Sequence, residues 1–218
     1  MWTVESETVK ELCARRPLAM RVLERHDIDP TERARLAECC AARGLEVATV
    51  LAELTRDEVE LAAPWRSRPM ALLLDHIIQR YHRPFDSMVT AAEAALDAAR
   101  PPSAAPSHEA WEELGRHLAE LRVDMEDHIS KQERVLFPWL RGRPETAAAP
   151  IRAMQLEHAD TLNLVHAIHT SVRRYVAFGP CGDVASRIEQ LEHWSCEHIQ
   201  LESNELFPGA LAVGPPRG

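Results

Sequence analysis

The sequence has little of what marks β-rich folds, membrane spans or secreted proteins. Aromatic residues make up 5% of the 218 residues, and alternating polar and apolar stretches are scarce, which argues against strands. The longest apolar run, PMALLLDHII, is interrupted by Asp75 and His76 and is far too short to cross a bilayer. The opening residues, MWTVESETVKELC, lack the apolar core of a signal peptide, so we expect neither export nor membrane contact.

The net charge and the cysteine content further limit the functional class and the cellular compartment that we expect for this protein. The formal net charge of −9 argues against a nucleic-acid partner, because phosphate binding needs concentrated lysine and arginine. The five cysteines are an odd number without a CxxC pair, which indicates reduced thiols and a cytoplasmic protein. No nucleophile elbow, phosphate loop or triad pattern is present, so the sequence leaves open whether the chain is an enzyme. The eleven histidines are the unusual feature.

The residues that dominate the chain are Ala, Leu, Glu and Arg, which favour helices. Four short segments have helical patterning, roughly at 5–14, 17–26, 31–43 and 46–62. Four longer ones follow at 69–99, 108–140, 147–178 and 183–211. Short connections between long amphipathic helices favour antiparallel neighbours. We therefore predict an all-α fold, with a small helical N-terminal domain over 1–62, a linker over 63–69 and an antiparallel four-helix bundle over 70–213.

One block of sequence occurs twice in the predicted bundle. HISKQERVLFPWL begins at His128 and HIQLESNELFPGA begins at His198, with His-Ile and Leu-Phe-Pro at matching offsets. Residues i and i+4 of a helix lie one turn apart and about 40° apart around the axis. His198 and Glu202 can therefore converge on one point, as can His128 and Gln132. Packing alone does not require a histidine at this place twice.

The first and third long segments each supply one more candidate among apolar residues. These are His82 in DHIIQRYHRPF and His158 in MQLEHADTLNLV. Inward ligands at one depth on each helix are how bundle cores build metal sites. Taken singly, a His-x-x-x-Glu pair is more often a surface ion pair, and a histidine beside apolar residues is more often a hydrogen-bonded core residue. The repeated block favours the metal site.

The remaining histidines are expected outside this site. His117 and His169 share faces with His128 and His158 but lie about three turns away along their helices. His76 falls on a different face from His82. We expect solvent-facing or capping positions for the last four, which are His26, His108, His166 and His193.

The strings DHIIQRYH, MQLEHADTLNLV and HIQLESNELFPGALA, with WRSRP before them, resemble the repair-of-iron-centres family of hemerythrin-like (HHE cation-binding) di-iron proteins. TVKELCARRPLAMRVLERHDIDP is similar to that family's short N-terminal domain, so the resemblance covers almost the whole chain. It implies an iron cofactor, a role in nitrosative and oxidative stress, NO or O₂ as small ligands and damaged iron–sulfur proteins as clients. It also allows a homodimer. The implied iron ligands are His82, His128, His158, His198 and Glu202.

Three departures from the family pattern change these expectations. Gln132 stands where a second carboxylate is expected, and residues 100–104 (RPPSA) lack an expected histidine. Pro30 follows Ile28-Asp29 where the family has adjacent cysteines. The pair Cys39-Cys40 comes later, inside a predicted helix, where the two side chains point about 100° apart and cannot chelate one metal.

The amide of Gln132 offers one good acceptor oxygen and no charge, so two ferrous ions would be poorly neutralised. A single Fe(II), Zn(II) or Mn(II) on three imidazoles and Glu202 is thus an alternative to the di-iron centre. Asp86, four residues after His82, is one candidate replacement carboxylate. Glu133 is another, although it needs a local bulge to turn inward. The alternative function is a degenerate hemerythrin-like sensor or interaction module with one metal or none.

Overall fold

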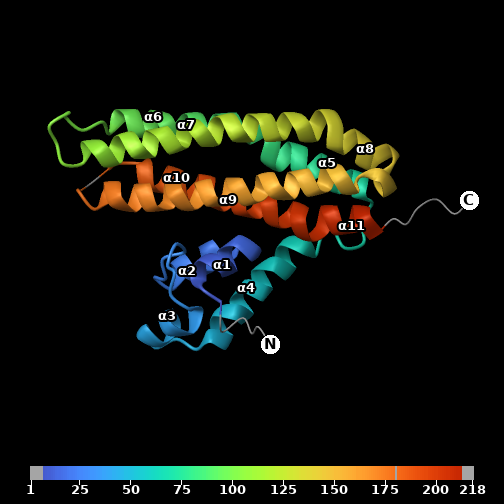
Figure 1. Cartoon of the computed structure of the whole chain (residues 1–218), viewed down its shortest axis with the longest axis horizontal. Helices are drawn as coiled ribbons and strands as arrows, with labels where there is room; N and C mark the ends of the chain where they lie inside the picture. The colour runs from blue at the N-terminus through green and yellow to red at the C-terminus, as the bar shows by residue number, and fades with distance from the viewer. Residues whose placement is uncertain (1–6, 180, 213–218) are drawn as a thin grey trace, which may run out of the picture.

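The structure is a computed structural model that describes residues 7–179 and 181–212. Within these ranges the regular secondary structure is helical, apart from one isolated bridge between Thr8 and Arg35. The predicted all-α fold is confirmed: Figure 1 shows a long helical bundle with a smaller group of N-terminal helices beneath it.

The bundle has four long limbs, and three of them change from α to π geometry for one turn before continuing as α-helix. The first limb contains α5 (Met70–Ile77), η2 (Ile78–His82) and α6 (Arg83–Ala98). The second contains α7 (His108–Lys131), η3 (Gln132–Leu136) and α8 (Phe137–Gly142). After the short 3₁₀ turn η4 (Pro144–Thr146), the third limb is the unbroken α9 (Ala148–Val176). The fourth contains α10 (Val184–Leu201), η5 (Glu202–Leu206) and α11 (Phe207–Ala212).

The four N-terminal helices are α1 (Val9–Arg15), α2 (Ala19–Arg25), α3 (Leu36–Ala42) and α4 (Val47–Ala62). Thr8 and Glu11 form a capping box that begins α1. The apolar core of these helices includes Leu162 and Val165 of α9 and Ile199 of α10. The N-terminal helices therefore pack directly on the bundle, and the domain boundaries proposed above stay a prediction.

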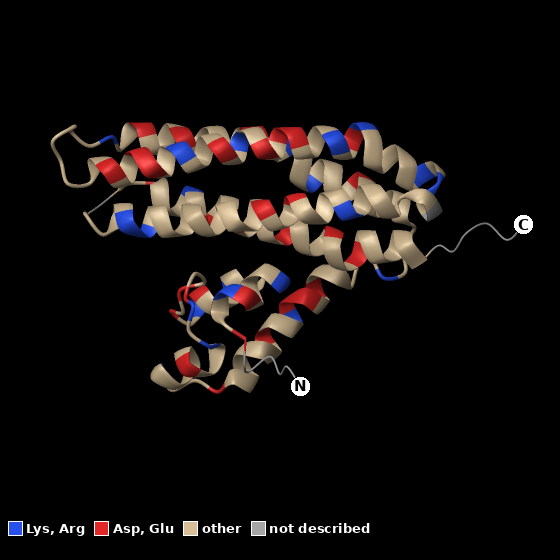
Figure 2. Ribbon diagram, in the orientation of Figure 1, with Lys and Arg blue, Asp and Glu red and all other residues tan. Residues whose placement is uncertain are grey.

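Charged residues of both signs are interspersed along the bundle helices (Figure 2). Arg122, for example, contacts Asp86, Glu93 and Glu126 within 4 Å. Among the described residues, no helix is both long enough and apolar enough to cross a membrane.

Candidate metal centre

Six polar side chains meet inside the bundle, each at most 5% exposed. They are His82 at the end of η2, His128 of α7, Gln132 at the start of η3, His158 of α9, His198 of α10 and Glu202 at the start of η5. The ring centroids of His82 and His198 lie 5.2 Å apart, and those of His128 and His158 lie 5.1 Å apart. The five residues that the family resemblance implied as iron ligands are thus brought to one place, and so is Gln132.

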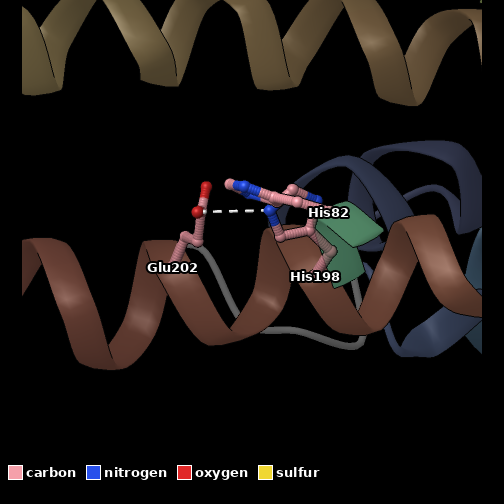
Figure 3. Close-up of side chains that lie close together, drawn as sticks. All are labelled: His82, His198 and Glu202. Carbon is pink, nitrogen blue, oxygen red and sulfur yellow. Dashed lines mark ion pairs between the residues drawn. The ribbon is translucent and has the colours of Figure 1, made fainter. Parts of the chain in front are cut away.

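Glu202 lies among the imidazoles. Its Oε1 is 3.2 Å from Nε2 of His198, one turn earlier on the same limb (Figure 3). Its Oε2 is 3.0 Å from Nε2 of His158 and 4.0 Å from Nε2 of His128. Two sets of possible ligands result, His82 with His198 and His128 with His158, and each set includes Glu202. One carboxylate thus connects two neighbouring positions where a cation fits.

The inner atoms of the site lack hydrogen-bond partners. Nε2 of all four imidazoles and Oε1 of Glu202 are buried without a hydrogen bond, although some of them approach one another. An unsatisfied buried polar atom costs about 1–3 kcal/mol, and five such atoms gathered at two neighbouring positions are rare in a folded core. Cations at these positions would supply the missing partners, so this donor set of nitrogens and one carboxylate fits a first-row metal.

The outer nitrogens of three imidazoles are fixed by neighbours. Nδ1 of His82 lies 3.0 Å from Glu133, Nδ1 of His128 lies 3.0 Å from Glu157, and Nδ1 of His158 lies 3.2 Å from the hydroxyl of Ser203. The two carboxylates accept from Nδ1 and so hold its proton there, which leaves Nε2 of His82 and His128 free to bind a metal, as outer partners of metal-binding histidines commonly do. The hydroxyl of Ser203 can accept from Nδ1 of His158 in the same way.

The pKa shifts of Glu202 and His82 favour the protonation states in which these side chains bind metal. Burial opposes the charge of Glu202, but His198 and His158 hold the pKa of this carboxyl well below its usual range. Burial and the neighbouring His198 lower the pKa of His82 to about 4. The pocket therefore combines an ionised carboxylate with a neutral imidazole at neutral pH, which are the forms that bind metal.

Gln132 is fully buried and turned into the site. Its Nε2 donates a 2.7 Å hydrogen bond to Oε2 of Glu202, and its Oε1 has no hydrogen-bond partner. The amide of Gln132 thus donates a hydrogen bond to Glu202. A carboxylate at this position would instead have added a second negative charge.

The two candidate replacement carboxylates do not stand among the inner ligands. Glu133 lies in the π turn η3, but it accepts from Nδ1 of His82 and from Arg83, on the outer side of the imidazole. Asp86 is 79% exposed and pairs with Arg122, so the structure places it outside the group of six inner side chains. The buried stripe of α6 passes through Phe85 and Val89, which leaves Asp86 on the solvent side.

The three π turns described above have a common cause that is visible in the sequence. Each ends in an i to i−5 hydrogen bond, from Arg83, Phe137 and Phe207, and a proline follows at the next position in all three. A proline has no N–H, and its ring clashes with the carbonyl four residues earlier. The wider π turn relieves this clash and lets the helix continue to Gly142 and Ala212. Such turns often mark functional sites.

Of the other histidines, most behave as expected. His117 is bonded to Ser171 away from the centre, and His26, His108 and His193 contact carboxylates near the surface. The expectation for His166 is wrong, because this side chain is only 4% exposed. His169 lies outside the centre, as predicted, but it meets Glu24 and Glu192 in a cluster that the sequence did not reveal. Glu24 is distant in sequence, and no motif connects it with α9.

The cysteines form no chelating pair in the described structure. Cys39 and Cys40 are buried and free, and the thiol of Cys39 donates to Glu32 at 3.0 Å. Burial and Glu32 raise the pKa of Cys39 to about 12, which keeps this thiol protonated.

Comparison with known proteins places this geometry in a family. The hemerythrin HHE cation binding domain matches residues 73–210, which include all six inner side chains. Proteins named iron–sulfur cluster repair protein YtfE from Citrobacter koseri (31% identical) and from Escherichia coli and Escherichia fergusonii (32% identical) match over 211 residues. These matches cover 93% of this chain and 95% of each relative. The chain therefore belongs to the hemerythrin HHE cation-binding family and, within it, to the repair-of-iron-centres proteins.

Proposed function

We propose that the chain binds iron in the bundle core and serves in the repair of iron–sulfur clusters. The observation that carries the proposal is the set of buried Nε2 atoms without partners, arranged as two pairs around Glu202. The names of the relatives support cluster repair as the purpose. Damaged iron–sulfur proteins are then the clients, and NO or O₂ the small ligands.

The ligand set suits non-haem iron. Two imidazoles and one carboxylate oxygen make up each half of the centre, which is the usual donor set for Fe(II) with open coordination positions. Ligand distances of about 2.0–2.1 Å put neighbouring ligand atoms roughly 3.3 Å apart in tetrahedral geometry. The separations of Glu202 from His158 and His198, 3.0 and 3.2 Å, are close to that spacing. Bound iron would supply a Lewis acid and one-electron chemistry.

The charge of the pocket favours unequal binding of two cations. Among the described residues, Glu202 is the one inner carboxylate, and the charges of Glu133 and Glu157 are shared with Arg83 and Lys131. The pocket therefore neutralises one divalent cation better than two. We propose that one iron is held tightly and a second is held weakly, which suits a protein that gives iron to a client. The same asymmetry favours the second candidate function, a sensor that keeps a single metal.

A repair assay separates these functions. Anaerobically iron-loaded chain is mixed with a [4Fe–4S] protein damaged by nitric oxide, and recovery of the cluster absorbance is followed. The wild type should restore the cluster faster than an equal amount of ferrous salt, whereas His198→Ala should not. Recovery no faster than with ferrous salt, by a chain that does hold iron, would reject repair in favour of the sensor.

A further inference from the structure

A second group of side chains that could hold a metal, two buried and one half-buried, joins the N-terminal helices to the bundle. Glu24 comes from α2, His169 from α9 and Glu192 from α10, elements that lie close together in Figure 1. One ligand atom from each lies within 4.8 Å of the others. Nδ1 of His169 is 3.2 Å from Oε1 of Glu24 and 3.3 Å from Oε2 of Glu192.

An ion pair alone leaves this cluster unsatisfied. A single Nδ1–H cannot point at two carboxylates at once, and the best hydrogen bond goes to one of them. Glu192 is only 4% exposed, and its Oε1 has no hydrogen-bond partner. Nε2 of His169 also lacks a hydrogen bond, with Asp29 at 3.9 Å. A buried carboxylate oxygen without a partner is costly, so Oε1 of Glu192 points to a missing ligand.

The spacing of the cluster matches that of a cation site. Separations of 3.2 and 3.3 Å are near the roughly 3.3 Å between ligand atoms of a tetrahedral zinc site. Burial raises the pKa of the Glu192 carboxyl, but when both carboxylates are ionised they supply the two negative charges that balance a divalent cation. The second oxygen of Glu24 is 3.2 Å from Nε2 of His193, a contact that orients the carboxylate from outside.

We propose that Glu24, His169 and Glu192 form a second metal site, for a divalent first-row cation of the zinc class, which fastens α2 to the bundle. A bound cation would satisfy the three side chains at once and connect three elements. The site is separate from the core centre, because it shares none of that centre's six side chains.

Charged groups surround the imidazole of His169. Burial opposes the charge on His169, but Glu192 and Glu24 raise the pKa of the imidazole to about 10. The other charged groups close to the cluster are Asp29, with Arg173 beside it, and His193.

The test counts zinc in the full chain. Zinc chloride alone is the probe, and bound zinc per chain is measured by equilibrium dialysis and elemental analysis. Relative to wild type, His169→Gln and Glu192→Gln should each lose about one zinc, with affinity reduced by more than about 100-fold. His198→Ala should lose zinc from the core and keep this one. His117→Gln, which changes a buried histidine elsewhere, should keep both.

Equal zinc content in wild type and in folded His169→Gln would overturn the proposal. If both ligand variants fail to fold, zinc-edge anomalous diffraction from wild-type crystals gives the answer. A peak between the three side chains is expected, and its absence in crystals that bind zinc in the core would overturn the proposal equally.

Discussion

Replacing Gln132 by glutamate tests how the missing charge limits the core centre. The amide nitrogen lies 2.7 Å from Oε2 of Glu202, so the substitution brings two carboxylates together in the metal-free chain. The hydrogen bond that is lost has a charged acceptor and contributes roughly 1.5–3 kcal/mol. Like charges this close do not both ionise, so the metal-free variant should bind a proton or be less stable.

With metal present, the added carboxylate stabilises the centre instead of destabilising it. At 4 Å and an effective dielectric constant of 20, one unit charge stabilises an opposite one by about 4 kcal/mol, hence about 8 kcal/mol for a divalent ion. Desolvation and repulsion from Glu202 cancel several kcal/mol of this gain. A net gain of about 3 kcal/mol corresponds to a roughly 100-fold tighter second iron.

The assay is iron per chain after identical anaerobic loading and desalting. Wild type should hold fewer than two irons, and Gln132→Glu should hold more than wild type. Gln200→Glu is the matched control, since Gln200 is a buried amide that donates to Glu58 outside the centre. Equal, full occupancy in wild type and Gln132→Glu would refute the reasoning about charge.

Four further predictions concern two carboxylates near the bundle core and two cysteines of the N-terminal helices. Glu157→Gln removes the acceptor for Nδ1 of His128 and should weaken iron binding by about 10–100-fold, as measured by competition with a chelator. Asp86→Asn should leave iron content unchanged and lower the free energy of unfolding by less than about 1 kcal/mol in urea titrations. Because burial and hydrogen bonding raise the pKa of Cys39 to about 12, its thiolate should be scarce at pH 8 and iodoacetamide should label it slowly unless the chain unfolds. Replacing Cys39 and Cys40 by alanine should leave the iron content unchanged, and a proportionate loss of iron would contradict this.

The sequence was sufficient to predict those helices whose apolar residues recur with helical periodicity. The four bundle limbs agree with the predicted segments to within a few residues, because long amphipathic helices and proline-rich connections leave a strong local signal. The inner histidines were predictable for a similar reason: the repeated block fixes His128 and His198 in equivalent places on two limbs.

What the sequence did not reveal depends on contacts between distant segments. The cluster of Glu24, His169 and Glu192 forms only because α2 docks on α9 and α10. Asp86 lies outside the centre because the buried stripe of α6 follows Phe85 and Val89, which the spacing from His82 to Asp86 alone does not show. The prolines that accompany the π turns were visible in the sequence, but a proline in a helical pattern more often predicts a helix end.

The most direct test of the central claim is iron-edge anomalous diffraction from crystals of the anaerobically iron-loaded chain. We expect a strong peak bounded by Glu202 and the Nε2 atoms of one imidazole pair, with a weaker peak at the other pair. We also expect that both peaks disappear in Glu202→Gln. Iron found only outside the bundle core, or a core peak that persists unchanged in Glu202→Gln, would contradict the account.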